Sequence, residues 1–190
     1  MKLIFATNNQ HKLSEIKQAV SNFELVGLKE YGIIEDIPET GDTLKENARQ
    51  KARYIFDKYG ENCFADDTGL EVVSLNGAPG VYSARYAGEN CSFEDNNTKL
   101  LSALTNVEDR RASFRTVICL IIDDTENYFE GVCEGIILAK YHGEEGFGYD
   151  PVFRPNGFKE SFAQMSTEQK NKISHRGLAV KKLIDFLNKK

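Results

Sequence analysis

The chain has 190 residues, of which 41% are hydrophobic and 28% charged, so it can bury a core and has the composition of a globular domain. Its formal net charge of −5 argues against broad electrostatic binding of nucleic acid or anionic membranes. No apolar run approaches the length of a membrane span, and the first residues lack the long apolar stretch of a signal peptide. We expect one domain over residues 1–190, with two lobes and no separate linker.

Residues 2–6 predict a buried strand, and a helix is predicted to follow it. Its apolar residues at helical spacing are Leu13, Ile16, Ala19 and Val20. A second helix is predicted from Thr43 to near Gly60, because Thr43 and Glu46 form a capping-box pattern. The next strand, from residue 63, is expected to end at Asp66 and Asp67. A turn and a second apolar run over residues 70–75 would then complete a hairpin.

The second half of the chain mixes further helices with strands. Ser92 and Asp95 predict another helix start, and residues 112–123 predict a long strand. Beyond a turn we expect a pair of strands over residues 128–132 and 135–139. Ser166 opens the last helical region, which ends on an apolar face. Helices and strands in this order predict an α/β fold with a mixed sheet.

The cysteines indicate the cellular compartment. Cys63, Cys119 and Cys133 lie in or beside apolar runs, and the four cysteines show no C-x-x-C spacing. Such positions favour buried, reduced thiols. Together with the negative net charge and the lack of a membrane span or signal peptide, the cysteines predict a cytoplasmic protein that binds neither membranes nor nucleic acid.

Two adjacent carboxylates, Asp66 and Asp67, are the most informative feature of the sequence. Neighbouring negative charges repel each other and are costly to desolvate, so folding alone gives no reason for them. A divalent cation would reverse that cost, and oxygen ligands suit Mg²⁺ or Mn²⁺. The pair therefore raises the question of a phosphate site elsewhere in the chain.

One candidate phosphate site joins the first strand to the first helix. A helix N-terminus offers unpaired backbone N–H groups and the positive end of a dipole. The polar residues there are Thr7, Asn8, Asn9, Gln10, His11 and Lys12. The loop lacks the glycines of a Walker P-loop. The alternative is a polar turn with an asparagine cap and a solvated lysine.

Two further charged residues are weaker candidates. Glu39 lies between Pro38 and Gly41, on a loop from which a carboxylate can reach a metal, although a surface glutamate before a helix is the commoner case. Lys51 lies four residues after Asn47, at the edge of the apolar face of the second helix. It either extends to water or points to a phosphate.

A glycine-rich loop over residues 143–151 carries two aromatic residues, Phe147 and Tyr149. Aromatic rings between glycines can stack on a flat ligand such as a base. The alternative, rings that cover the core from outside, is as consistent with the spacing.

Ser174, His175 and Arg176 place a hydroxyl, an imidazole and a guanidinium at a break in a helical pattern. Arg176 can donate two parallel hydrogen bonds to a base edge or a phosphate, whereas the alternative is a solvated basic turn. A serine hydrolase is disfavoured because no G-x-S-x-G elbow is present. Together, the phosphate loop, the carboxylates, the aromatic loop and the arginine are the parts of a nucleoside triphosphate site.

Seven short motifs carry a resemblance to a known family. They are residues 5–9 with Lys12, 39–41, 46–48 with 51–53, 65–70, 77–86, 146–151 and 173–177. In this order they make the chain similar, almost end to end, to the inosine/xanthosine triphosphate pyrophosphatase family of house-cleaning enzymes. Asn9 departs from the frequent Gly-Asn of that family, and Thr68 stands where many members have serine. Neither change removes a group that the chemistry needs.

The resemblance implies an elongated, two-lobed α/β fold around a long central mixed sheet, with the active site in the cleft between the lobes. It implies a homodimer and a Mg²⁺-dependent activity, with Mn²⁺ as a substitute. Deaminated purine triphosphates (ITP, dITP and XTP) would be hydrolysed between the α and β phosphates to a monophosphate and pyrophosphate.

The resemblance also implies residue roles. Residues 7–12 and Lys51 would bind the phosphates, and Glu39 and Asp67 would bind metal. Asp67 would also accept the proton of the attacking water, while Asp66 is either a second metal contact or a partner of Lys51. The implied nucleoside-binding residues are Phe147, Gly148, Tyr149, Asp150, Lys170, His175 and Arg176, and Thr68 is a further candidate for substrate binding.

Base choice follows from hydrogen bonding. Hypoxanthine and xanthine present a carbonyl at position 6 where adenine presents an amine, so a buried Arg176 would favour the deaminated bases. Two alternatives remain open. One is a related pyrophosphatase acting on modified pyrimidine or other nucleotides, and the other is a nucleotide- or RNA-binding module without turnover.

Overall fold

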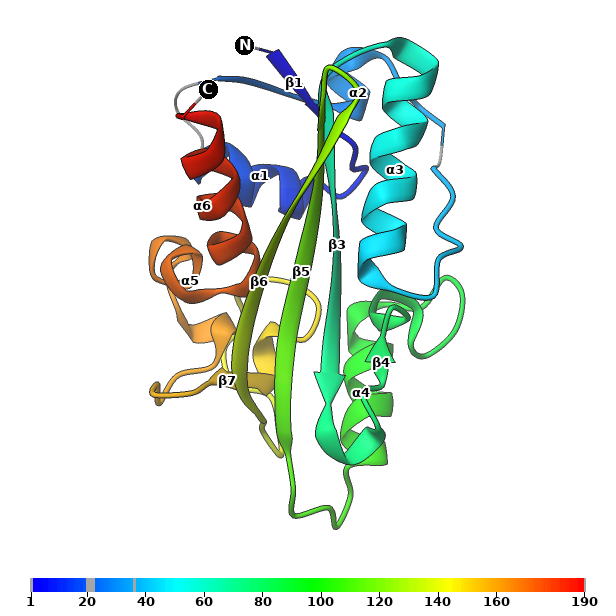
Figure 1. The fold of residues 1–190 in the computed structure, drawn as a ribbon. Coiled ribbons are helices and arrows are strands. Elements are labelled where there is room, and N and C mark those ends of the chain that lie inside the picture. The colour runs from blue at the N-terminus through cyan, green and yellow to red at the C-terminus, as the bar shows by residue number, and fades with distance from the viewer. Residues whose placement is uncertain (1, 20–22, 36, 190) are drawn as a thin grey trace. The chain divides into compact units, whose positions relative to one another are not determined.

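The computed structural model describes residues 2–19, 23–35 and 37–189 (Figure 1). Val20, expected on the first helix, lies outside the described residues. In chain order the helices and strands are β1 (Lys2–Phe5), α1 (Gln10–Ala19), β2 (Glu24–Gly27), α2 (Leu28–Tyr31), α3 (Leu44–Tyr59), β3 (Cys63–Val72), β4 (Pro79–Gly80), α4 (Phe93–Ala103), β5 (Arg111–Ile122), β6 (Thr125–Ile137), β7 (Phe153–Pro155), α5 (Thr167–Ile173) and α6 (His175–Leu187). The described residues also form the short 3₁₀ turns η1 (Val73–Leu75), η2 (Ser83–Arg85), η3 (Asp150–Val152) and η4 (Phe162–Gln164).

The strands form a mixed sheet, which confirms the predicted α/β class. Its order is β2-β1-β3-β5-β6-β7, and β4 pairs with β3. β1 runs parallel to both β2 and β3, whereas β4 and β7 pair antiparallel with β3 and β6. None of the helices among the described residues is long and apolar enough to span a membrane.

The chain divides into two compact units. Unit 1 comprises Met1–Asp67, Thr116–Gly131 and Arg176–Lys190, and unit 2 comprises Thr68–Arg115 and Val132–His175. Three strands, β3, β5 and β6, contribute residues to both units. The boundary within β3 falls between Asp67 and Thr68.

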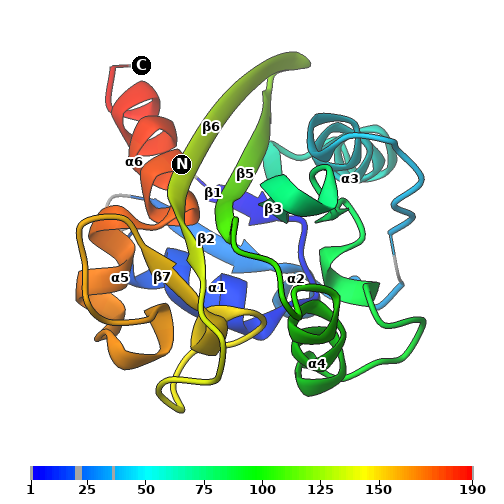
Figure 2. The same cartoon turned by 90° about the horizontal axis from the view of Figure 1, so that it is seen from below.

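Unit 1 has two hydrophobic layers, one on each face of its strands. Successive side chains of a strand point to opposite faces, so Phe64 packs in one layer and its neighbours Cys63 and Ala65 in the other. The layer of Phe64 contains buried residues of α1 and α6, and the layer of Cys63 contains buried residues of α3. Figures 1 and 2 accordingly show α3 and α6 on opposite sides of β1 and β3.

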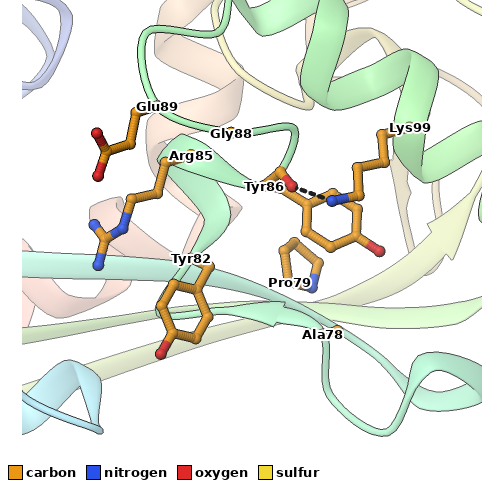
Figure 3. Close-up of a pocket in the computed structure, with 8 residues that line it drawn as sticks. All are labelled: Ala78, Pro79, Tyr82, Arg85, Tyr86, Gly88, Glu89 and Lys99. Carbon is orange, nitrogen blue, oxygen red and sulfur yellow. Dashed lines mark hydrogen bonds between the residues drawn. The ribbon is translucent and has the colours of Figure 1, made fainter.

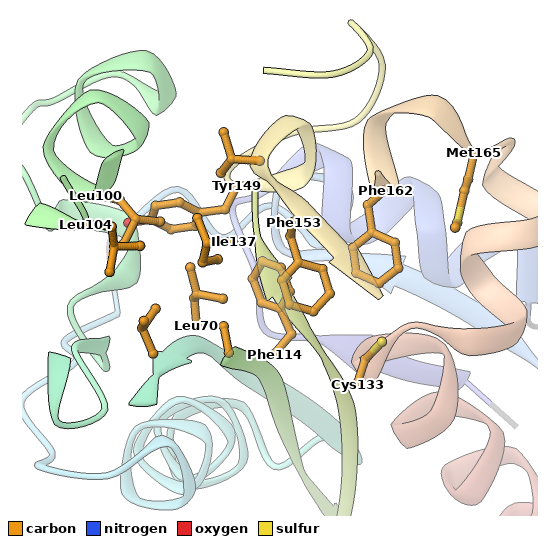
Figure 4. Packing of buried hydrophobic residues seen from close by; sticks show 13 residues of the cluster. Leu70, Leu100, Leu104, Phe114, Cys133, Ile137, Tyr149, Phe153, Phe162 and Met165 are labelled. Carbon is orange, nitrogen blue, oxygen red and sulfur yellow. The ribbon is translucent and has the colours of Figure 1, made fainter. Parts of the chain in front are cut away.

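Unit 2 has a separate core around three phenylalanine rings (Figure 4). The ring of Phe114, on β5, lies 4.7 Å from that of Phe153, which lies 5.1 Å from that of Phe162. Leu100 of α4 packs in the same cluster. This core supports the segments on which the predicted nucleoside-binding residues of unit 2 lie.

The predicted helix starts are confirmed. In α3, the Thr43 side chain accepts from the Glu46 backbone, and the Glu46 carboxylate accepts from the Thr43 backbone. Ser92 and Ser166 cap α4 and α5 in the same reciprocal way. These signals are local, because both partners lie within one helical turn. The predicted break in the last helical region is also present, at Ser174 between α5 and α6.

Two strand predictions were wrong, in both cases because a strand is longer than expected. β3 does not end at Asp66 and Asp67 but runs without a turn from Cys63 to Val72. The strand can bury Asp66 because cations from elsewhere in unit 1 surround this carboxylate. The expected strand pair over residues 128–139 is the single strand β6, in which alternate residues remain buried across Cys133.

Candidate functional site

The predicted phosphate loop lies between β1 and α1, as expected. Thr7 and Asn9 order its backbone: Thr7 Oγ1 accepts from the Asn9 amide at 3.2 Å, and Asn9 Oδ1 accepts from the Lys12 amide at 3.2 Å. Asn9 thereby caps the start of α1. Three side chains of this loop are exposed to solvent, namely Asn8, Gln10 and His11. The loop therefore combines an ordered helix N-terminus with exposed polar groups.

Asp66 is buried, with none of its side-chain surface exposed. Lys12 Nζ donates to its Oδ1 at 2.9 Å, and Arg176 Nε donates to its Oδ2 at 3.2 Å. Burial opposes ionisation of Asp66, but the two cations outweigh it and hold its pKa below the usual range. Asp66 is therefore a fixed negative charge that orients Lys12 and Arg176.

Asp67 has a different environment, formed by α3. Asn47 Nδ2 donates to its Oδ2 at 3.1 Å, and Lys51 Nζ lies 3.6 Å from its Oδ1. Burial raises the pKa of Asp67, although Lys51 opposes this shift. A carboxylate with a raised pKa is a better proton acceptor than an ordinary aspartate, so the geometry divides the two neighbouring acids into different chemical roles.

The alternation of β3 explains this division. Asp66 follows Phe64 on the face covered by α1 and α6, and Asp67 follows Ala65 on the face covered by α3. Consecutive residues of the strand thus meet different helices. Their mutual repulsion is smaller than adjacency in sequence suggests, because their carboxylates point apart.

Glu39, Lys51 and Asp67 form the candidate metal centre. Lys51 Nζ is hydrogen-bonded to Glu39 Oε1 and also pairs with Asp67, so one ammonium lies between the two predicted metal ligands. A cation between two carboxylates shows that this donor set can hold positive charge. Two carboxylates also suit Mg²⁺, which is commonly bound by one or two of them together with substrate phosphates. The residues present therefore fit the predicted metal.

The predicted aromatic loop belongs to unit 2. Tyr149 is only 4% exposed and donates its hydroxyl to the Ser83 carbonyl at 2.9 Å, so its ring belongs to the core (Figure 4). Phe147 is only partly buried and has more ring surface with which to stack on a base. Asp150 Oδ2 accepts from the Phe147 amide at 2.8 Å, which closes the loop.

Lys170 of α5 joins this loop. Its Nζ donates to Asp150 Oδ2 at 2.7 Å and lies 4.9 Å from the centre of the Phe147 ring. The structure thus brings together three of the predicted nucleoside-binding residues, Phe147, Asp150 and Lys170. His175 is buried, with its ring stacked on Phe114 at 4.5 Å. Thr68 lies half-buried on β3.

Arg176 begins the part of α6 that belongs to unit 1, and it is buried there between two acids. Besides Asp66, it binds Glu15 of α1, with Nη1 donating to Oε2 at 2.6 Å. These carboxylates raise the pKa of Arg176 in spite of its burial. Sequence reasoning missed Glu15, because a partner 161 residues away leaves no local pattern. The contact of Arg176 with a base stays a prediction.

A shallow pocket of about 370 Å³ lies elsewhere in unit 2 (Figure 3). Tyr82 and Tyr86 line it, with the guanidinium of Arg85 over the ring of Tyr82 and Lys99 Nζ over that of Tyr86. Lys99 also donates to the Tyr86 carbonyl at 2.5 Å. None of the predicted site residues lines this pocket, but Tyr149 donates to the Ser83 carbonyl in the turn that carries Tyr82.

Comparisons with known proteins agree on one family. Residues 3–186 match the model of the Ham1 family. The dITP/XTP pyrophosphatase of Christiangramia forsetii is 55% identical over 190 residues, which cover 100% of both chains. That of Porphyromonas gingivalis is 57% identical over 98% of this chain and 97% of its own. The solved Staphylococcus aureus Ham1 protein is 43% identical, with a TM-score of 0.90 over 99% of this chain and 98% of its own.

Proposed function

Because the chain belongs to the Ham1 family and is a nucleoside triphosphate pyrophosphatase like its curated relatives, we propose that its substrates are the deaminated purine nucleotides ITP, dITP and XTP. This membership confirms the family predicted from the seven sequence motifs. The products would be the nucleoside monophosphate and pyrophosphate. The proposed compartment is the cytoplasm, where free cysteines such as the buried Cys63 and Cys119 stay reduced.

One observation carries the proposal: Asp67 combines a raised pKa with a cation and a second carboxylate beside it. Asp67 is therefore suited to accept the proton of a water that attacks the α–β phosphoanhydride. Glu39 and Asp67 would hold the proposed Mg²⁺, which when bound supplies positive charge to the phosphates. Lys12 and Lys51 would add positive charge for the same phosphates.

In the sequence, the proposed nucleoside contacts come from residues before and after Ser174, which separates α5 from α6. Phe147, Asp150 and Lys170 offer a ring, a carboxylate and an ammonium within one hydrogen-bonded group. Arg176 would donate to the carbonyl at position 6 of the base. Its two carboxylate partners favour one guanidinium orientation, which would limit its ability to adapt to an amine.

A panel of triphosphates tests the proposed substrates. We expect Mg²⁺-dependent pyrophosphate release from ITP, dITP and XTP, with much slower release from ATP, GTP and the pyrimidine triphosphates. Excess EDTA should abolish the release, and added Mg²⁺ should restore it. A preference for modified pyrimidines would instead support the related pyrophosphatase, and RNA binding without hydrolysis would support the binding module.

Replacing Arg176 with alanine should reduce base discrimination. We expect the ratio of kcat/KM for ITP to kcat/KM for ATP to fall by about 10–100-fold, because a charged hydrogen bond of about 1.5–3 kcal/mol is lost with ITP alone. Glu15→Gln is the control, since it removes a carboxylate partner of Arg176 but keeps the guanidinium. An equal loss of activity on ITP and ATP in Arg176→Ala would contradict the assignment.

A further inference from the structure

Two adjacent asparagines on α4, Asn96 and Asn97, are buried, and each holds a different loop of unit 2. Asn96 accepts from the Ala87 amide at 2.7 Å and donates to the Ala84 carbonyl at 3.1 Å. Asn97 Nδ2 donates to the carbonyl of Gly148 at 2.8 Å. The two side chains therefore fix separate backbone segments from one helix, and Asn97 fixes the loop of the proposed base-binding residues.

The bond from Asn97 acts on the least constrained residue of that loop. Gly148 has a φ of 63°, and apart from its chain neighbours no described residue has a heavy atom within 4 Å of the position that its Cβ would occupy. Its neighbours are held by other contacts, Phe147 through its amide to Asp150 and Tyr149 through its hydroxyl to Ser83. A residue without a side chain is fixed only through its backbone, so the donor from Asn97 sets the Gly148 peptide.

The position of Asn97 in the helix indicates a role other than packing in the hydrophobic core. Asn97, Leu100, Leu101 and Leu104 follow the spacing of one helix face, on which the leucines pack in the unit 2 core. Asn97 is only 1% exposed, and its Oδ1 has no hydrogen-bond partner among the described residues. Burying an unsatisfied acceptor is unfavourable. An apolar side chain would avoid that cost but would leave the Gly148 carbonyl without this donor.

We propose that Asn97 is a positioning residue for base recognition: it fixes the Gly148 peptide and thereby the placement of the Phe147 ring. This inference rests on the proposed function of the loop over residues 147–150. Phe93, at the start of α4, supports the same placement, because its ring centre lies 6.1 Å from that of Phe147. Through Asn97 and Phe93, helix α4 thus contributes to the placement of the proposed stacking ring.

The matched variants Asn97→Leu and Asn96→Leu test the proposal, because both remove a buried asparagine from the same helix. Kinetics on ITP and ATP are measured for both. We expect Asn97→Leu to raise the KM for ITP and the KM for ATP about tenfold, because a displaced ring loses its stacking geometry with either purine. Asn96→Leu should keep both KM values, although its stability falls. Unchanged KM values in Asn97→Leu, or an equal rise in both variants, would overturn the proposal.

Hydrogen exchange provides a second readout that is independent of activity. The amide of Phe147 should exchange about tenfold faster in Asn97→Leu than in wild type and should be unaffected in Asn96→Leu. If Asn97→Leu does not fold, Asn97→Ser serves instead, since its hydroxyl is too short to replace the amide donor. Wild type that fails to hydrolyse ITP would refute the proposed function, whereas unchanged Phe147 exchange in a folded Asn97 variant would refute the positioning role.

Discussion

Replacing Asp67 with asparagine is expected to lower the rate of triphosphate hydrolysis by about 10²–10⁴-fold, the usual effect of removing a positioned general base. An asparagine keeps the shape of the side chain and can still accept from Asn47, but it cannot take a proton. Nucleotide affinity should persist, because Lys12 and Lys51 remain. Turnover measured with saturating ITP, together with binding measured by calorimetry, would separate the two effects.

Asp57→Asn is the matched control for this experiment. Asp57 also lies in unit 1, on α3, but its side chain is 66% exposed and pairs with Arg53 in an i,i+4 contact. Such surface pairs contribute little to stability. Near-normal turnover in Asp67→Asn, at the level of Asp57→Asn, would remove Asp67 from the mechanism.

Replacing Asp66 with asparagine should instead act on stability. We expect the free energy of unfolding to fall by about 3–5 kcal/mol, the usual cost of leaving one member of a buried ion pair without its partner. Lys12 and Arg176 would keep their charges in a site from which the balancing carboxylate has gone. Urea denaturation of the variant and of wild type at pH 7 measures this difference.

The effects of Asp66→Asn and Asp67→Asn on the free energy of unfolding should differ in sign as well as in size. The folded-state pKa of Asp66 is lowered, so its ionisation stabilises the fold above about pH 4, and this contribution is lost as the pH falls through the folded-state pKa. The pKa of Asp67 is raised, so its charge opposes folding at neutral pH. Asp67→Asn should therefore leave the free energy of unfolding unchanged or higher. Equal destabilisation by both variants would contradict the assigned environments.

Local patterns predicted the helix starts, and long-range pairing explains what they could not predict. The partners of each cap, such as Thr43 and Glu46, lie within one turn, so the sequence contains the whole interaction. The continuity of β3 depends instead on Arg176, which lies 110 residues from Asp66. No pattern around residues 63–72 indicates that this charge will be compensated, and a strand end was the reasonable local prediction.

Prediction of the candidate site from local sequence patterns was limited in the same way. Residues 7–12 were identified because a strand–loop–helix junction has its own sequence signature. The sequence also marks Asn97 as unusual, since it is a polar residue on the apolar face of a predicted helix. Its hydrogen bond to the Gly148 carbonyl could not be predicted, because every residue type has a backbone carbonyl and the sequence therefore does not mark this acceptor. The burial of Tyr149 likewise depends on the core of unit 2.

The opposite orientations of Asp66 and Asp67 have a consequence for how this enzyme can vary. The two carboxylates accept hydrogen bonds from different helices, Asp66 from α1 and α6 and Asp67 from α3. A substitution that removes one of these hydrogen bonds therefore affects one acid directly, whereas the charges of Lys12 and Lys51 act on both acids. The same geometry makes the strand intolerant of length changes. A single inserted or deleted residue just before Asp66 would shift the alternation by one and exchange the surroundings of the two acids.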